Sequence, residues 1–281
     1  MNSIQDTVTL KNGVQIPCVG YGTWKTSPEQ TIDAVKAAIA AGYRHIDTAR
    51  AYGNESAVGQ AITESGIARK DIFLTTKLWN AHQGYEGTLK AFDKSLKALQ
   101  SDYIDLYLIH WPHDSKFFDN WQEMNVESWR AFEELYRTGK VRAIGVSNFR
   151  SHHIENIRKH SEIMPMVDQI EFHPGMAQSE TREYCRIHDI VVEGWSPLGS
   201  GSVFQSPVMQ QLAEKYHKSI AQICIRFALQ NNVIPLPKSL HPKRIQANAE
   251  IFDFQIEEED MHTIAETDCG FSGMDPDNLI Y

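Results

Sequence analysis

Four residues in the first 110 positions carry side chains that could together donate a proton to a reacting oxygen. They are Asp47, Tyr52, Lys77 and His110, and three of them end a short β-rich run. A phenol titrates near pH 10, and a neighbouring ammonium lowers that pKa by favouring the charged form. A carboxylate would keep the ammonium charged, and a histidine opposite could hydrogen-bond a substrate oxygen. Together they predict a general acid for an oxygen that gains negative charge, as when a carbonyl accepts hydride.

Each of the four residues also has an ordinary structural explanation. Tyr52 could be a half-buried loop residue, and Asp47 with Lys77 could form a structural ion pair. His110 could be a hydrogen-bonded core histidine, which is the usual fate of a lone histidine. One polar strand end therefore carries little weight, and the hypothesis depends on several strands ending in polar groups at one rim of the fold.

A metal centre is a further alternative in a chain with 12 histidines. The first predicted strand, "CVGYG", lacks a His-x-His. The adjacent His152 and His153 fall at a predicted helix start, where we expect their side chains to point apart. The sequence therefore predicts no metal site.

The elements that would position these residues alternate regularly along the chain. After a hairpin with its turn at Asn12-Gly13, β-rich runs alternate with helical stretches. The predicted strands cover residues 18–22, 43–47, 71–77, 104–110, 141–148, 166–172, 190–196 and 233–238. The predicted helices cover residues 28–41, 54–65, 87–99, 126–139, 151–160, 179–188, 207–231, 242–252 and 257–266.

This alternation predicts an α/β fold, the closed (β/α)8 TIM barrel, as a single domain over residues 1–281. The strands are nearly continuous in Val, Ile and Leu, as strands buried on both faces are. An N-terminal hairpin and an extra C-terminal helix would complete the barrel. A doubly wound open sheet is the alternative, but no GxGxxG follows the first strand. In a barrel the active site lies at the C-terminal ends of the strands.

Composition limits the class of protein. A net charge of −9 argues against a nucleic-acid or membrane-surface binder, which needs a basic face. No apolar run approaches the roughly 18 to 20 residues that cross a bilayer, and the N-terminus does not resemble a secretory signal. Cys18, Cys185, Cys224 and Cys269 show no CxxC spacing and fit reduced thiols. We predict a cytoplasmic protein, and nothing in the sequence demands more than a monomer.

The predicted reaction requires a cofactor, because no amino acid donates hydride. Lys238, Lys243 and Arg244 place three positive charges within seven residues, close to a predicted helix start. Such a start also favours anions, so the 2′-phosphate of NADPH would suit this segment. A solvated basic helix start is the alternative. Trp195 at a strand end could stack on a nicotinamide ring, and "SPLGSGS" (196–202) offers hydroxyls to a pyrophosphate.

These motifs resemble the aldo-keto reductase family over essentially the whole chain. The carriers of the resemblance are "GYRHIDTARAYGNESAVG", "TTKLW", "YLIHWP" and "LPKSLHPKRIQAN", in this order. The bacterial-type members, similar to small aldehyde and 2,5-diketo-gluconate reductases, are nearest in length. The resemblance implies a (β/α)8 barrel with Tyr52 as the acid, Lys77 and Asp47 as its tuners, and His110 as the residue that orients the substrate.

The resemblance also implies a set of cofactor contacts. Ser147, Asn148 and Gln169 would bind the nicotinamide amide. The full cofactor set is Gly22, Thr23, Trp24, Asp47, Ser147, Asn148, Gln169, Trp195, Ser196, Leu198, Ser200, Lys238, Ser239, Arg244 and Asn248. Of these, residues 196, 198 and 200 would contact the pyrophosphate, and residues 238, 239 and 244 the 2′-phosphate. Ala247 departs from the glutamate common in the family, so one adenine contact is missing.

The substrate pocket is expected to be aromatic. Trp24, Trp79, His110 and Trp111 would line it, together with the aromatic and polar stretch at 112–124. The tail after the last helix is short, so any specificity loop there would be small, and it could pack as a lid or lie disordered.

The main functional hypothesis is NADPH-dependent reduction of small aldehydes and ketones to alcohols. A cofactor-binding redox sensor or regulatory subunit on the same fold is the alternative, although a binding module has no need of the four residues discussed first. A dehydrogenase working mainly in the oxidative direction is a third possibility, because the same site catalyses both directions.

Overall fold

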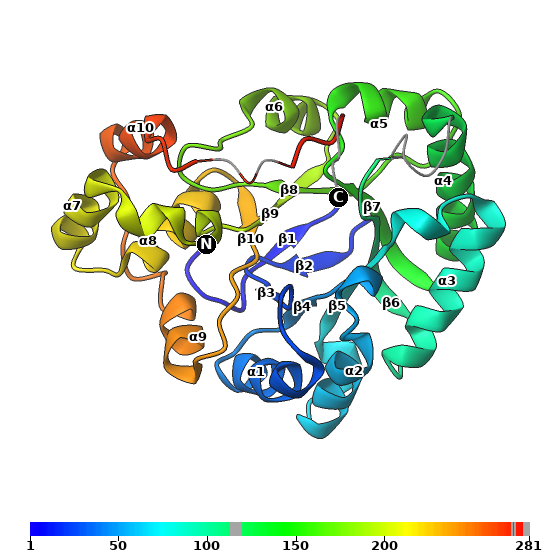
Figure 1. The fold of residues 1–281 in the computed structure, drawn as a ribbon, viewed down its shortest axis with the longest axis horizontal. Helices are drawn as coiled ribbons and strands as arrows, with labels where there is room; N and C mark the ends of the chain where they lie inside the picture. The colour runs from blue at the N-terminus through cyan, green and yellow to red at the C-terminus, as the bar shows by residue number, and fades with distance from the viewer. Residues whose placement is uncertain (113–119, 271, 273, 278–281) are drawn as a thin grey trace.

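The main sheet of the computed structural model closes on itself. The structure describes residues 1–112, 120–270, 272 and 274–277. Within them, eight parallel strands follow the order β10-β9-β8-β7-β6-β5-β4-β3. Backbone hydrogen bonds from Gly20 to Pro235 (3.0 Å) and from Gly22 to Pro237 (3.1 Å) join the two edges. The predicted (β/α)8 barrel is confirmed, and Figure 1 shows the helices arranged around the strands.

The strands and helices alternate as predicted, with small differences at their ends. The barrel strands are β3 (Tyr21–Gly22), β4 (His45–Asp47), β5 (Phe73–Leu78), β6 (Ile104–Ile109), β7 (Val141–Ser147), β8 (Val167–Glu171), β9 (Val191–Trp195) and β10 (Val233–Pro235). The α-helices are α1 (Pro28–Ala40), α2 (Glu55–Glu64), α3 (Tyr85–Ala98), α4 (Trp121–Arg137), α5 (Ser151–Arg158), α6 (Ser179–Ile187), α7 (Pro207–Tyr216), α8 (Ile220–Gln230), α9 (Pro242–Ala249) and the additional α10 (Glu258–Glu266).

The predicted N-terminal hairpin is present. Strands β1 (Thr7–Thr9) and β2 (Gln15–Pro17) pair antiparallel, and Gly13 in the turn adopts a φ of 84°. Asn12 donates a side-chain hydrogen bond of 2.9 Å to the carbonyl of Arg142, near the start of β7. The hairpin therefore contacts the N-terminal end of the barrel, opposite the rim where the strands end.

Local sequence explains where α1 begins. The hydroxyl of Ser27 accepts a hydrogen bond from the backbone of Gln30 (3.3 Å), and the side chain of Gln30 accepts one from the backbone of Ser27 (3.3 Å). Pro28 occupies the first turn, where it loses no helical hydrogen bond. Helix α4 instead begins at Trp121, five residues before the predicted start, and Trp121 packs edge-on against His153. Tertiary contacts thus extend this helix beyond its apolar pattern.

Parallel pairing aligns the polar strand ends at one rim. Gly22 lies beside Asp47 in the register of β3 and β4, and Ser147 lies beside Gln169 in that of β7 and β8. Every residue of β5 and β6 is buried, so the backbone that carries Lys77 on β5 is packed on all sides. A rigid frame therefore supports the side chains at this rim.

The described part of the C-terminal tail packs along the same rim. It runs from α10 toward α5 (Figure 1). The hydroxyl of Ser272 donates to Oε2 of Glu171 at 2.7 Å, and Arg150 pairs with Asp275 at 3.0 Å. These tail residues therefore pack against the barrel and its helix α5. Positions 113–119 of the predicted aromatic stretch lie outside the described residues.

Two predictions from composition concern compartment and membrane. Across the described ranges, no helix is long and apolar enough to span a membrane. The four cysteines, Cys18, Cys185, Cys224 and Cys269, are buried and form no disulfide.

Candidate active site

A pocket of about 1160 Å³ opens at the C-terminal rim of the barrel. Its lining includes every site residue predicted from the sequence except Thr23 and Lys77. Thr23 is fully buried, and its hydroxyl donates to the backbone oxygen of Asp47 at 3.0 Å. The volume slightly exceeds the usual range for small-ligand sites, so one pocket has room for a dinucleotide and a small substrate.

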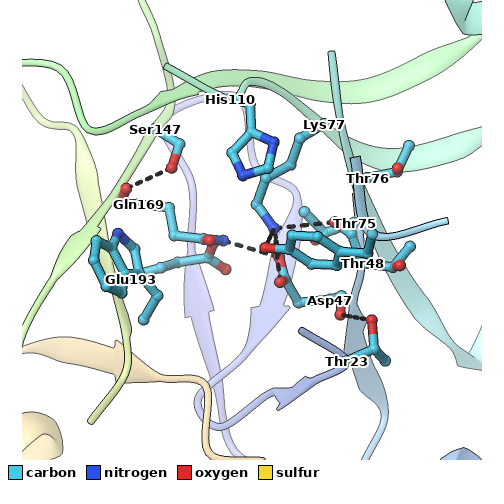
Figure 2. A network of polar contacts seen from close by, with 12 residues as sticks. Thr23, Asp47, Thr48, Thr75, Thr76, Lys77, His110, Ser147, Gln169 and Glu193 are labelled. Atoms are coloured by element: carbon cyan, nitrogen blue, oxygen red, sulfur yellow. Dashed lines mark hydrogen bonds and ion pairs between the residues drawn. The ribbon is translucent and has the colours of Figure 1, made fainter. Parts of the chain in front are cut away.

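Lys77 lies beneath the pocket floor and is fully committed to hydrogen bonds. Its Nζ contacts Oδ1 and Oδ2 of Asp47 at 2.7 and 2.8 Å and the backbone oxygen of Thr48 at 3.0 Å. The hydroxyl of Tyr52 lies 3.5 Å from the same Nζ. An ammonium has three hydrogens, so Asp47 and Thr48 fix its direction and hold its charge beside the phenol. Figure 2 shows Lys77 with Asp47 and Thr48.

Two opposing effects set the pKa of Tyr52. Burial raises the pKa of Tyr52, and the ammonium of Lys77 opposes this rise without reversing it. The ammonium lowers the pKa of the phenol as predicted, but the cost of a buried phenolate outweighs this one positive charge. Burial also lowers the pKa of Lys77, but Asp47, Tyr52 and Glu193 together raise it above its ordinary value. The site therefore holds a protonated phenol beside a charged ammonium.

His110 stands beside Tyr52 at the end of β6. Its ring packs edge-on against Tyr52 and Trp79, with centroids 5.6 and 5.5 Å apart. Burial and the charge of Lys77 lower the pKa of His110 well below its usual range. The imidazole is therefore neutral at neutral pH and suited to orienting an oxygen rather than to protonating it.

Hydrogen bonds fix the side chains of Asn148, Ser147, Trp195 and Gln169 next to this cluster. Asn148 donates to the backbone oxygen of His110 (2.9 Å) and to the hydroxyl of Ser147 (3.1 Å), and its Oδ1 accepts from the indole of Trp195 (2.7 Å). The amide nitrogen of Gln169 donates to Oδ2 of Asp47 at 2.9 Å. Because the side-chain hydrogens of Asn148 and Gln169 are already engaged, what they still offer the pocket is acceptor oxygen. Such oxygens suit a ligand that carries an NH₂ group.

Part of the pocket lining is positively charged. Lys25, Lys238, Lys243 and Arg244 line it. Among the described residues none of the four pairs with a carboxylate. Burial and the charge of Lys25 lower the pKa of Lys238. Cations without a carboxylate partner in a pocket favour an anionic ligand there.

Several lining residues were not predicted from the sequence. Lys25 stacks its ammonium 4.2 Å above the ring of Trp24, and its place after that aromatic residue was the only available signal. Phe204 and Met274 reach the pocket from the segment after β9 and from the tail. Glu193 lies beneath the pocket and is fully buried. Its alternation with Trp195 along the strand could have indicated an inward side chain.

The prediction that His152 and His153 point apart was wrong. Their ring centroids lie 3.9 Å apart, and their Nε2 atoms lie 2.9 and 3.1 Å from the same oxygen of Asp277. The tail draws the two rings together. Nδ1 of His153 accepts the backbone hydrogen of Arg150 at 3.1 Å, which leaves the proton of the neutral ring on Nε2. With this helix cap intact, His153 has no lone pair for a metal.

Comparison with known proteins places this chain in a family. The model of the aldo/keto reductase family matches residues 18–268. The chain belongs to the aldo/keto reductase family. This aldo/keto reductase is 50% identical to glyoxal reductase of Bacillus subtilis over 281 residues, which cover 99% of each chain.

Solved structures of other family members have the same fold. An aldo/keto reductase from Brucella melitensis is 50% identical with a TM-score of 0.89, and the match covers 95% of this chain and 99% of that one. A variant of Gox0644 in complex with NADPH is 40% identical with a TM-score of 0.91, and the match covers 99% of each chain. The solved structures that share this fold thus include one with NADPH bound, and it matches this chain over nearly its whole length.

Proposed function

We propose that this aldo/keto reductase uses NADPH to reduce the carbonyl group of small aldehydes and ketones. The observation that carries the proposal is one pocket lined both by Asp47 and Tyr52, with Lys77 beneath them, and by cations that no carboxylate pairs among the described residues. The similarity to a family member in complex with NADPH supports the cofactor. The name of the Bacillus relative supports small dicarbonyls such as glyoxal among the substrates.

The residues present fit a nicotinamide dinucleotide phosphate. Arg244, Lys238 and Ser239 would hold the 2′-phosphate, and Ser196, Leu198 and Ser200 would surround the pyrophosphate, since all of these line the pocket. Trp195 would stack on the nicotinamide, because Asn148 fixes its indole with a 2.7 Å hydrogen bond. The acceptor oxygens of Ser147, Asn148 and Gln169 would bind the NH₂ of the carboxamide. When bound, the cofactor supplies the hydride.

The side chains of this chain would perform the proton transfer. His110 orients the carbonyl oxygen toward Tyr52, whose hydroxyl donates its proton as negative charge develops on that oxygen. Lys77 then stabilises the phenolate that forms, and Asp47 holds Lys77 in the charged form through two short contacts. The proton is present before the reaction because the pKa of Tyr52 lies above its ordinary value through burial.

The substrate side of the pocket favours small carbonyl compounds with an apolar or flat body. Trp24, Trp79, Trp111 and Met274 line it, and no carboxylate other than Asp47 does so among the described residues. We also propose that the protein acts as a single domain and as a monomer, because this one barrel holds both the catalytic cluster and the cationic side chains.

Tyr52→Phe tests the proposed acid. We expect NADPH consumption with glyoxal or methylglyoxal to fall by a factor of about 10² to 10⁴, the usual contribution of general acid catalysis. NADPH binding, followed by protein fluorescence, should persist. Tyr107→Phe is the matched control, because Tyr107 is buried on β6 and its hydroxyl has no partner within the described part of the chain. Turnover retained by the Tyr52 variant, or lost equally in both variants, would remove Tyr52 from the mechanism.

A further inference from the structure

Beneath the pocket lies a second buried carboxyl that the proposed chemistry does not use. Glu193 on β9 is fully buried, and its Oε2 accepts a hydrogen bond of 2.8 Å from the amide of Gln169. The same amide nitrogen donates to Asp47. One amide thus bridges two carboxyl groups, and Figure 2 shows Gln169 between Asp47 and Glu193.

The charges of this cluster do not balance if both carboxyl groups are ionised. Lys77 is the ammonium at this place, and its hydrogen bonds go to Asp47, to the backbone of Thr48 and, at 3.5 Å, to Tyr52. No hydrogen bond joins Lys77 to Glu193 among the described residues. An isolated buried carboxylate is costly and takes up a proton instead. Glu193 is therefore neutralised by a proton of its own or by another neighbour.

His45 is the neighbour that could share this proton. Its Nε2 lies 3.6 Å from Oε1 of Glu193 and 3.0 Å from the hydroxyl of Thr75. Neither Nδ1 of His45 nor Oε1 of Glu193 has a hydrogen-bond partner in the described structure. A Cβ at Gly20 would lie 2.7 Å from that Nδ1, so the ring packs directly against the backbone there.

The pKa directions agree on where the proton resides. Burial and the negative charge of Asp47 raise the pKa of Glu193 to about 8, against the weaker effects of Gln169 and Lys77. Burial and the charge of Lys77 lower the pKa of His45 to about 3. The charged or titratable groups acting on Glu193 are thus Asp47, Lys77 and His45. The pair at pH 7 is a protonated carboxyl beside a neutral imidazole.

We propose that Glu193 keeps a proton at neutral pH and acts as a positioning residue, so that the charge of Lys77 acts on Tyr52 without opposition from a second carboxylate. The neutral carboxyl also holds Gln169 in place beside Asp47. When Glu193 loses its proton, a negative charge is added beside Asp47 and Lys77. The phenolate of Tyr52 then becomes harder to form, because a like charge raises the pKa of an acid.

Glu193→Gln tests this role with little change of shape. Infrared spectroscopy detects the C=O stretch of a protonated carboxyl at pH 7, and the variant should lose one such signal. Asp168→Asn is the matched control. Burial raises the pKa of Asp168 well above its ordinary value, and its Oδ2 faces Cys185 of α6 at 4.0 Å. Asp168 therefore gives a second signal outside the barrel interior.

Kinetics provide the second readout. In the alcohol-oxidising direction the phenolate of Tyr52 accepts the proton. Turnover should therefore increase less between pH 6.5 and 9 in the wild-type protein, where Glu193 becomes ionised, than in Glu193→Gln. The difference should be about tenfold for each pKa unit by which ionised Glu193 raises the pKa of Tyr52. Asp168→Asn should follow the wild-type profile. Identical profiles for Glu193→Gln and wild type would overturn the tuning role.

The infrared and kinetic measurements distinguish failure of the inference about Glu193 from failure of the proposed reductase function. The tuning role rests on the proposed reductase chemistry, whereas the infrared signal reports the proton whether or not any carbonyl is reduced. If Glu193→Gln does not fold, Asp168→Asn alone decides the protonation state. A protonated carboxyl signal that survives in Asp168→Asn and disappears as the pH passes about 8 supports the inference. Complete loss of the signal in that variant means that Glu193 is ionised, and the inference is wrong.

Discussion

Replacing Lys77 by methionine should strongly destabilise the fold, because it leaves the buried carboxylate of Asp47 without its positively charged partner. The side chains of Lys77 and Asp47 are only 1% and 5% exposed, and Nζ lies 2.7 Å from Oδ1. Removing one partner of a buried ion pair costs about 3 to 5 kcal/mol. Methionine fills much of the space of lysine, so the lost charge dominates the effect. We expect a decrease of this size in the free energy of unfolding, measured by urea titration of the protein without cofactor.

A second substitution distinguishes loss of charge from loss of packing. Asp47→Asn in the Lys77→Met background removes the unpaired charge, and at least about half of the lost stability should return. Carbonyl reduction should not return, because the double variant still lacks the ammonium beside Tyr52. If the second substitution lowers stability further, the penalty lies in packing and not in charge.

The control is an ion pair on the surface. Lys36 and Glu64 lie 3.0 Å apart with side chains 42% and 41% exposed. Exposed pairs contribute about 0 to 1 kcal/mol, so Lys36→Met should change the free energy of unfolding by no more than that. Equal losses for Lys36→Met and Lys77→Met would refute the view that burial gives the catalytic pair its strength.

Three further predictions concern the cofactor, pH and the backbone. Arg244→Ala should raise the KM for NADPH by about ten- to a hundredfold through loss of a charged hydrogen bond, with little change in the KM for NADH; equal changes for both cofactors would disprove the 2′-phosphate contact. The pKa of Glu193 is raised from 4.5 to about 8, so the folded protein loses stability as the pH rises through this range. The pKa of His45 is lowered from 6.5 to about 3, so the folded protein loses stability as the pH falls from 6.5 to about 3. These contributions offset each other between about 4.5 and 6.5, so Glu193→Gln should uncover an acid loss that begins near pH 6.5; urea midpoints that fall in parallel for variant and wild type would contradict this. Gly175→Ala would place a Cβ 2.1 Å from a backbone oxygen after α10 at a φ of +80°, whereas the Cβ of Gly139→Ala, at a φ of +73°, would meet nothing within 4 Å. Gly139→Ala should cost roughly 1 to 3 kcal/mol of stability through backbone strain, and Gly175→Ala should cost clearly more. Equal decreases in melting temperature would show that the close contact relaxes freely.

The sequence predicted those parts of the site that follow from local pattern. Strand periodicity and a polar residue at each strand end were enough to bring Asp47, Lys77 and His110 to one rim, because parallel strands of a barrel end together. The direction of the pKa of Tyr52 was not predictable, since it depends on how completely the surrounding residues exclude water. Periodicity carries no measure of that exclusion.

Contacts made by the tail were equally beyond local pattern. Ser272 reaches Glu171 across 101 positions, and the tail residue Asp277 brings together two histidines that their own helix would separate. These residues lie in a segment without a regular apolar repeat, so their partners are set by the shape of the finished barrel. The roles of the individual site residues, as opposed to their positions, remain predictions for the experiments above.

The hydrogen bonds that close the barrel have a consequence for how the protein is made. Gly20 and Gly22 pair with Pro235 and Pro237, which are about 215 positions later in the chain. During synthesis, strand β3 therefore emerges long before its second neighbour β10 exists. Such distant pairings form slowly, and an unpaired strand edge invites association with other chains. The last strand to leave the ribosome thus covers an edge that the first barrel strand has exposed throughout translation.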